Sequence, residues 1–402
     1  MRAKILLLGV SALLLAACAD DADDDAADAT EDVADTTEDA ADDTDDADDA
    51  DDTAAPEDPV RIGVVFSQTA GAAVYGETQT QAAQMAAEEI NEAGDVAIEL
   101  VIEDDASDPE QGITAYERLI QQEDVSALIG PTLSNVFFSA GPLAQDAGIP
   151  ALGVSTTADG ITDIGEYIFR NALTERQVIP DTVAAATEQF GLERVALLHS
   201  DDDAFTVSGY EIMVEAAEDL GLEVVSDQSF ATGDSDFSAQ LTSARDEDPD
   251  ALLVSALAEE AALLLTQAQD LGLDVPVIGG NGFNSPAIID QAGEDAEGVI
   301  VGAAWNAAAD DPMNEEFKAA YEERTGSRPD QFAAQAYAGV YLIAQAIEAA
   351  GSDDPNAIRD ALEGLSNVQT VLGEFSFTDN RDADHEGVTQ IVQDGEFQIL
   401  AG

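Results

Sequence analysis

The chain has 402 residues, and its 85 acidic residues against 13 basic ones give a formal net charge of −72 at pH 7. A protein with this charge is repelled by phosphate backbones and anionic lipid headgroups, which excludes nucleic acid and anionic membrane surfaces as partners. The single cysteine of the chain excludes an internal disulfide framework and a cysteine-rich metal site.

The chain begins with a pattern that resembles a bacterial lipoprotein signal. Arg2 and Lys4 precede an apolar run at residues 5–15, which has signal-peptide length and is too short to span a membrane. Small residues then lead to Cys18, so we expect residues 1–17 to be a signal peptide and Cys18 to carry a lipid anchor. This predicts an extracytoplasmic protein held at the membrane by its acyl chains. The alternative is an ordinary secretory signal with an unrelated cysteine.

An acidic segment follows the cysteine. Residues 19–57 are nearly all Asp, Ala, Thr and Glu, a composition that has little to bury and repels itself. We therefore predict that residues 18–57, including the lipidated cysteine, form a disordered tether. Calcium binding is the alternative use of so many carboxylates, but the sequence of this segment has no glycine and no calcium-loop motif.

The rest of the chain is also strongly acidic. From Asp58 onward it holds 65 acidic and 11 basic residues, and Lys318 is the only lysine after the signal peptide. Repulsion between such dense charges is screened when the Debye length falls to about 3 Å in 1 M salt. We therefore expect a halophilic acidic surface that requires salt.

Apolar runs and amphipathic segments alternate along this part. Strands are predicted at residues 60–66, 97–102, 126–129 and 150–154, with helices at 75–93, 109–122 and 136–147. The pattern restarts after Arg170, with strands at 194–199, 222–226, 251–255, 275–279 and 298–304 and helices at 176–190, 207–220, 237–246 and 259–271. Helices at 315–324, 332–350 and 356–365 and short strands at 373–377, 388–392 and 397–400 complete the chain.

This order predicts an α/β protein with two doubly wound parallel-sheet lobes. Strands that alternate with helices of about ten to fifteen residues form parallel sheets covered on both faces. Ligands bind beyond the carboxyl ends of the strands in such sheets, so we expect the site in the cleft between the lobes.

Five stretches, taken together and in order, resemble the substrate-binding proteins of branched-chain amino acid ABC transporters. They lie at residues 60–94, 99–120, 127–136 (ALIGPTLSNV), 149–162 (IPALGVSTTADGIT), and, as a pair, 233–255 and 276–289. The resemblance implies the type I periplasmic binding protein fold with a three-crossing hinge. Lobe 1 would comprise residues 58–173 plus 305–370, and lobe 2 residues 174–304 plus 371–402. It also implies a monomer without a cofactor or metal that delivers a small-molecule ligand to an ABC permease.

Four hydroxyl residues are candidates for binding a carboxylate. Ser134 opens a predicted helix, and Ser155, Thr156 and Thr157 follow a predicted strand. Hydroxyls and unsatisfied backbone N–H groups at such places suit an anion. The resemblance implies that the matching serine and threonine hold the α-carboxylate of the ligand. The alternative role of each residue is an N-cap or a turn.

The resemblance also implies aromatic walls at Tyr75 and Phe205, and an acidic partner for the ligand's ammonium group at residue 281. This chain has Asn281 there, which offers only a neutral amide. Either another acid, such as Asp203 or Glu260, takes the ammonium, or the ligand is an amide, a urea-like compound or a small carboxylate.

The sequence also bears on two other classes of function. An enzyme is disfavoured, because His199 and His385 are the only histidines and the segment Gly153-Val154-Ser155 lacks the last glycine of a nucleophile elbow. A ligand-sensing receptor with the same two-lobed fold stays open as an alternative to transport.

Overall fold

The computed structural model describes residues 58–400, so the predicted signal peptide, Cys18 and the acidic tether lie outside the described residues. Within this range the chain forms a five-stranded sheet, a seven-stranded sheet and a small three-stranded sheet. The helices are α1 (Ala73–Ala93), α2 (Pro109–Gln122), α3 (Ser134–Ala147), α4 (Glu175–Phe190), α5 (Ala204–Leu220), α6 (Ser238–Asp246), α7 (Ala258–Asp270), α8 (Pro286–Ala292), α9 (Pro312–Thr325), α10 (Gln331–Ala350) and α11 (Pro355–Glu363).

The first sheet, which we call sheet A, is parallel throughout. Its spatial order is β2–β1–β3–β4–β5. The strands are β1 (Val60–Phe66), β2 (Ile98–Asp104), β3 (Ala127–Ile129), β4 (Ala151–Gly153) and β5 (Ile168–Arg170). Each pair of successive strands, up to β4, is connected by a helix, which is the expected consequence of parallel pairing.

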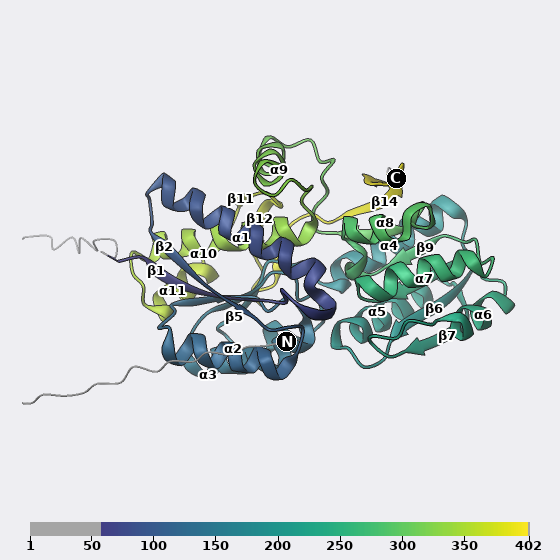
Figure 1. Cartoon of the computed structure of the whole chain (residues 1–402), viewed down its shortest axis with the longest axis horizontal. Coiled ribbons are helices and arrows are strands. Elements are labelled where there is room, and N and C mark those ends of the chain that lie inside the picture. Colours follow the sequence, from purple (N-terminus) through teal and green to yellow (C-terminus); the bar gives the residue numbers. More distant parts are fainter. Residues whose placement is uncertain (1–57, 401–402) are drawn as a thin grey trace, which may run out of the picture. The chain divides into compact units, whose positions relative to one another are not determined.

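Helices cover both faces of sheet A, as Figure 1 shows. Val64 and Phe66 of β1 lie in a core cluster with α1, α10 and α11, whereas Val65 lies in a second cluster with α2 and α3. This division follows from the side-chain period of two in a strand. Because both faces are buried, β1 reads as a continuous apolar run.

The second large sheet, which we call sheet B, is parallel at its centre and antiparallel at one edge. Its order is β15–β14–β10–β9–β8–β6–β7, and β14 runs antiparallel to both β10 and β15. The C-terminal strands therefore extend a doubly wound core as a hairpin. The strands are β6 (Arg194–Ser200), β7 (Glu223–Phe230), β8 (Ala251–Ser255), β9 (Val277–Gly279), β10 (Ile300–Ala303), β14 (Val388–Gln393) and β15 (Glu396–Ile399).

Three connections join the two sheets. The chain passes from β5 to α4, from β10 to α10, and from the small sheet to β14. The small sheet consists of β11 (Val368–Thr370), β12 (Gly373–Phe377) and β13 (Ala383–Asp384), and it packs on both cores. Phe375 belongs to a core cluster with the strands of sheet B, and the Phe377 ring makes an edge contact with Phe169 of β5 at 5.2 Å.

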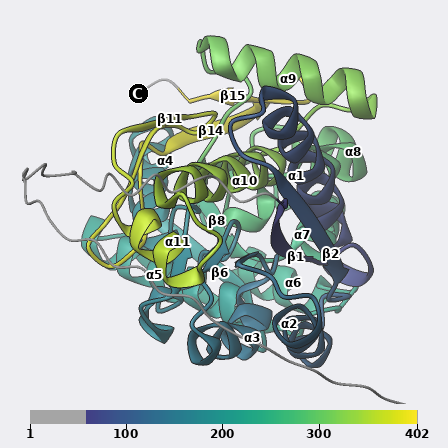
Figure 2. The same cartoon turned by 90° about the vertical axis from the view of Figure 1, so that its left-hand side faces the viewer.

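The expected fold class is confirmed, with two lobes of helix-covered sheet and three crossings between them. Figure 2 shows α2 and α3 beside each other below β1 and β2, and α10 and α11 to the left of these strands. The strands β5, β11 and β13 and the helix α8 are additions to the predicted elements, whereas the predicted strands at 388–392 and 397–400 form the antiparallel edge of sheet B as β14 and β15. In residues 58–400 no helix is both long enough and apolar enough to cross a membrane.

Candidate functional site

Loops beyond the carboxyl ends of strands from both large sheets enclose a small cavity of about 20 Å³. This is the position at which open α/β sheets bind ligands. Five of the seven residues predicted for the site line the cavity, while Thr156 and Thr157 are buried and do not line it. The lining residues are Tyr75, Thr132, Leu133, Ser134, Ser155, Phe205, Leu257, Asn281, Gly282 and Phe332.

Ser134 is the first residue of α3 and has an unused hydroxyl proton. Its Oγ accepts a hydrogen bond of 3.3 Å from the backbone N–H of Ala158, which joins the loops after β3 and β4. No acceptor for the hydroxyl proton lies within hydrogen-bond distance among residues 58–400. Ser134 therefore offers a donor, at a helix start, to an anionic group in the cavity.

The Ser155 hydroxyl, in contrast, is fully used inside the protein. It donates to the backbone oxygen of Thr132 at 2.7 Å and accepts from Gln79 Nε2 at 2.8 Å. Thr132 Oγ1 in turn donates to Gln79 Oε1 at 2.6 Å. Ser155 lines the cavity, but its hydroxyl fixes the loops and has no proton left for a ligand.

Thr156 and Thr157 also have buried side chains. Thr156 Oγ1 lies over Gly153, where an added Cβ would come within 2.2 Å of it. Thr157 Oγ1 donates a hydrogen bond of 2.9 Å to Glu175 Oε1. Glu175, the first residue of α4, also accepts a hydrogen bond of 3.3 Å from the backbone N–H of Asn281. One carboxylate thus contacts two of the predicted site residues.

Aromatic side chains form one wall of the cavity. Tyr75 and Phe332 pack with ring centroids 4.3 Å apart, and Phe205, which is 5% exposed, also lines the cavity. The Tyr75 hydroxyl donates a hydrogen bond of 2.7 Å to the backbone oxygen of Gly282. This bond joins α1 to the loop after β9 beside the cavity.

The oxygen of the Asn281 side chain is already occupied. Gln331 Nε2 donates to Asn281 Oδ1 at 2.6 Å, and the backbone N–H of Ala304 donates to Gln331 Oε1. The backbone donor fixes which end of the Gln331 amide faces Asn281. Asn281 therefore accepts from Gln331 with its oxygen and has only its NH₂ group to offer a ligand.

This contact is the first of a chain of buried amides. Asn284 Oδ1 accepts from Gln390 Nε2 at 2.7 Å, and Gln390 Oε1 accepts from Asn306 Nδ2 at 2.5 Å. Asn284 Nδ2 lies 3.4 Å from Asn281 Oδ1, so the chain reaches the cavity. It connects α10, the loop after β9, β14 and the segment after β10.

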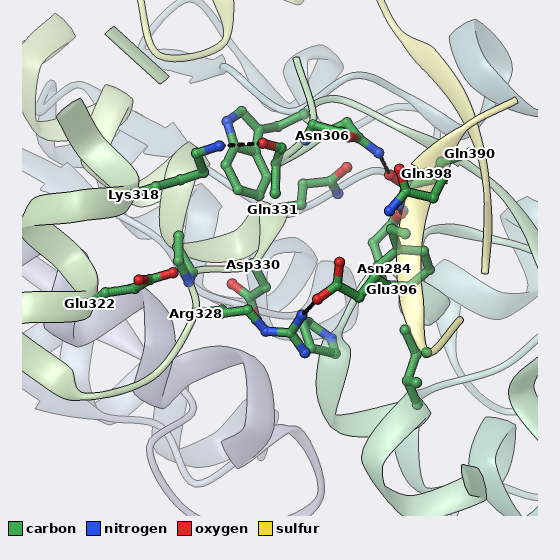
Figure 3. Close-up of a pocket in the computed structure, with 18 of the residues that line it drawn as sticks. Asn284, Asn306, Lys318, Glu322, Arg328, Asp330, Gln331, Gln390, Glu396 and Gln398 are labelled. Carbon is green, nitrogen blue, oxygen red and sulfur yellow. Dashed lines mark hydrogen bonds and ion pairs between the residues drawn. The ribbon is translucent and has the colours of Figure 1, made fainter. Parts of the chain in front are cut away.

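A larger cavity of about 380 Å³ lies on the other side of these amides. Figure 3 shows Asn306, Gln331, Gln390 and Asn284 on its wall, with Lys318 and Arg328 at its edges. Lys318 Nζ donates to the backbone oxygen of Ala307 at 2.6 Å, and Arg328 pairs with Glu396. Both cations of this cavity are therefore engaged by the protein.

Two buried acids lie next to residues of the smaller cavity, because Glu175 contacts Asn281 and Asp330 precedes Gln331 and Phe332 in the chain. Burial raises the pKa of Glu175 to about 7, and the more distant charge of Asp159 adds to this effect while Arg170 opposes it. Burial also raises the pKa of Asp330 to about 7. Desolvation, and then the charges of Glu260, Asp330 and Asp203, raise the Tyr75 pKa well above its ordinary value.

No Lys or Arg is among the residues that line this cavity in the described chain. The site therefore combines a negative field with one hydroxyl donor, and the field favours a ligand that carries a positive charge. Residues 58–400 also contain no cluster of three or more His, Cys, Asp or Glu side chains that is placed to hold a metal ion.

Sequence reasoning missed Glu175, Gln331 and Phe332. Glu175 occupies the first turn of a capped helix, a place where acids are common for reasons of helix stability alone. Gln331 and Phe332 open α10, and their pattern predicts only an amphipathic helix. No signal in the sequence distinguishes these three residues from ordinary helix-start residues.

Comparison with known proteins identifies the family. The family model described as periplasmic binding protein matches residues 59–395. The chain belongs to this family. Membership indicates an extracytoplasmic binding protein, in agreement with the resemblance found in the sequence.

Two similar proteins are named for binding or transporting branched-chain amino acids. A leucine-, isoleucine-, valine-, threonine- and alanine-binding protein of Pseudomonas aeruginosa is 29% identical over 329 residues, which cover 81% of this chain and 87% of that protein. A branched-chain amino acid transporter substrate binding protein of Streptococcus pneumoniae, solved with isoleucine, is 28% identical. Its TM-score is 0.80, and the match covers 85% of this chain and 98% of that one.

A third relative binds a different ligand. The solute binding protein of an ABC transporter from Rhodopseudomonas palustris, solved with 3,4-dihydroxy benzoic acid, is 27% identical with a TM-score of 0.77. The match covers 85% of this chain and 95% of that one. Proteins of this fold and similar identity therefore bind both amino acids and aromatic acids, and the family alone does not define the ligand.

Proposed function

We propose that the protein is the substrate-binding component of an ABC importer and captures a branched-chain or related amino acid in the cavity between its lobes. The lobes are residues 58–173 plus 305–370 and residues 174–304 plus 371–402. The observation that carries the proposal is the cavity itself, which combines the donor hydroxyl of Ser134, the aromatic wall and a negative field. A zwitterion satisfies the donor and the field together, whereas a bare anion satisfies only the donor.

The mechanism is closure of the lobes around the ligand. The ligand carboxylate binds Ser134 and the N-terminus of α3, and its side chain packs against Tyr75, Phe205 and Phe332. The bond from Tyr75 to Gly282 then forms between the lobes and excludes water, which strengthens the polar contacts. The closed form is the one delivered to the permease.

The location of this function follows from the N-terminal segment. Residues 1–17 are removed, the lipidated Cys18 anchors the protein, and residues 18–57 keep the lobes near the permease at a high effective concentration. Labelling of growing cells with a radioactive fatty acid tests the anchor. Incorporation into the wild type and none into Cys18→Ser is expected, and equal labelling of both would contradict it.

A small aromatic carboxylate is the second candidate ligand. It is favoured by the neutral Asn281 and by the three aromatic rings at the cavity. A thermal-shift screen in high salt with the five amino acids of the Pseudomonas relative and with 3,4-dihydroxybenzoate distinguishes the two, because a ligand of the native state raises the melting temperature. A shift with an amino acid supports the proposal, and a shift with the aromatic acid alone overturns it.

A further inference from the structure

The direction of one hydrogen bond restricts what Thr157 can bind. A hydroxyl has one proton, and the Thr157 proton is donated to Glu175 Oε1. Towards a ligand, Thr157 Oγ1 therefore presents only lone pairs. It accepts from a ligand donor, such as an ammonium group, and it does not donate to a carboxylate.

Asn281 does not supply a negative counter-charge for that donor. Its Oδ1 already accepts from Gln331 Nε2 at 2.6 Å, and the direction of this bond is set by the backbone N–H of Ala304. The group that Asn281 has available is its NH₂, which is itself a donor. The charge that balances an ammonium group comes from elsewhere in the site.

Glu175 is placed to provide this charge. Its carboxylate is 0% exposed and accepts from the backbone N–H of Asn281, which lines the cavity, and from Thr157 Oγ1, which is buried and does not line it. Its Oε2 has no hydrogen-bond partner in the part of the chain that the structure describes. Arg170, the cation that acts on it, pairs with Asp382 at 2.5 Å.

A buried carboxylate without an ion-pair partner is costly, and a cation that arrives beside it removes part of that cost. We propose that Glu175 is the counter-charge for the ammonium group of an α-amino acid, which binds against Thr157 Oγ1 while its carboxylate binds Ser134. This inference rests on the proposed function and specifies the ligand as a zwitterion. Glu175 would take the role of the acidic residue that the resemblance implies at position 281. Thr157 would contact the ammonium group of the ligand and not its carboxylate.

The other nearby acids have different partners. Asp203 caps α5 by accepting from the backbone N–H groups of Phe205 and Thr206, and Glu260 accepts from the backbone N–H of Gly233 at 2.7 Å. Neither acid contacts Thr157 or Asn281 in the described residues. Asp203→Asn is therefore a matched control, since asparagine caps helices as well as aspartate does.

The test compares two probes that differ only in the ammonium group. L-leucine and 4-methylpentanoate are titrated by calorimetry into the full chain, in high salt, as the wild type, Glu175→Gln, Asp203→Asn and Glu175→Gln combined with Asn281→Asp. We expect the wild type to prefer leucine strongly. Glu175→Gln should lose at least about tenfold of its leucine affinity with its affinity for 4-methylpentanoate unchanged or increased. Asp203→Asn should keep the preference, and the double variant should regain part of it.

Three results would overturn the inference. Glu175→Gln could keep its leucine affinity, it could lose affinity for both probes equally, or Asp203→Asn could be the variant that loses the preference. In each case wild-type binding of leucine leaves the proposed function intact. A wild type that binds 4-methylpentanoate but none of the five amino acids overturns the proposed function, and this inference with it. Thermal unfolding of each variant confirms that it is folded.

Discussion

The Tyr75 hydroxyl donates a hydrogen bond of 2.7 Å to the backbone oxygen of Gly282, two residues that lie 207 positions apart in the chain. Tyr75 belongs to α1 beside sheet A, and Gly282 belongs to the loop after β9 of sheet B. The bond therefore joins the two lobes, and the proposed mechanism requires it to form on closure. It also lies beside the cavity, so in the proposed mechanism ligand capture and lobe closure involve the same contact.

Removal of this hydroxyl should speed ligand release. Tyr75→Phe keeps the ring contact with Phe332 but loses a bond worth about 1 kcal/mol, so we expect the dissociation rate of the bound ligand to rise several-fold. Stopped-flow displacement measures this rate. Tyr116→Phe is the control, because the Tyr116 hydroxyl donates to Gly130 within one lobe. Equal effects of the two substitutions on the rate would contradict a role in closure.

Two serines that line the same cavity should differ in their effects. Ser134→Ala removes the donor that faces the ligand, so ligand affinity should fall by about tenfold with little change in stability. Ser155→Ala breaks bonds to Thr132 and Gln79, so the free energy of unfolding should fall by about 1 kcal/mol. Calorimetry and urea unfolding separate the two effects, and a larger affinity loss in Ser155→Ala would refute this assignment.

The buried carboxylate of Glu175 should make stability depend on pH. Its pKa is about 7 in the folded chain against 4.5 ordinarily, so the folded state binds the proton more tightly than the unfolded state. Its favourable contribution is complete below pH 4.5 and is lost as the pH rises through about 7. Glu175→Gln lacks this titration, so its stability relative to the wild type should increase from pH 5 to pH 8, by on the order of 3 kcal/mol.

Urea unfolding of the wild type and of Glu175→Gln at both pH values, in the same high salt, measures that difference. The comparison between variants cancels the titration of the histidines and of the other acids. A difference that stays constant or falls towards pH 8 would show that Glu175 is not buried as a costly carboxylate. Together with the binding experiment, the expected result would show that the ionised Glu175 carboxylate lowers the stability of the fold and strengthens ligand binding.

Salt should stabilise the whole described chain. From Asp58 onward the chain holds 65 acidic and 11 basic residues, and the basic residues that form ion pairs are mostly at the surface, where such pairs contribute little. Screening of the remaining repulsion should raise the melting temperature steadily between about 0.1 M and about 3 M NaCl. A neutral osmolyte is the control, because it does not screen charge. The same melting temperature at both salt concentrations would contradict a salt-requiring surface.

Regular elements with strong local patterns could be predicted from the sequence. The predicted strands at 60–66 and 251–255 and the predicted helix at 109–122 have the bounds of β1, β8 and α2. A fully buried strand is a continuous apolar run, and α2 has Asp108 as its cap and proline at its start, so each has a local cause. In contrast, β5 spans three residues, and its position is set by pairing with β4 rather than by its own sequence.

The candidate site was only partly predictable for the same reason. Ser134 follows a strand and opens a helix, which are local features. The burial of Glu175, in contrast, results from contacts with Thr157 and Asn281, which lie 18 and 106 residues away. Likewise, the Asn281 side-chain oxygen accepts a hydrogen bond from Gln331, which lies 50 residues further along the chain. The burial of Glu175 and the hydrogen bonding of Asn281 result from tertiary contacts, so they cannot be predicted from the local sequence.

Calorimetric titration of L-leucine into the wild type and Ser134→Ala, in high salt, tests the central claim most directly. We predict binding of one leucine per wild-type chain and an affinity at least about tenfold lower in the folded Ser134→Ala variant. No binding of leucine, isoleucine, valine, threonine or alanine by the wild type, or equal leucine affinity in the two proteins, would contradict the assignment of the cavity as an amino acid site.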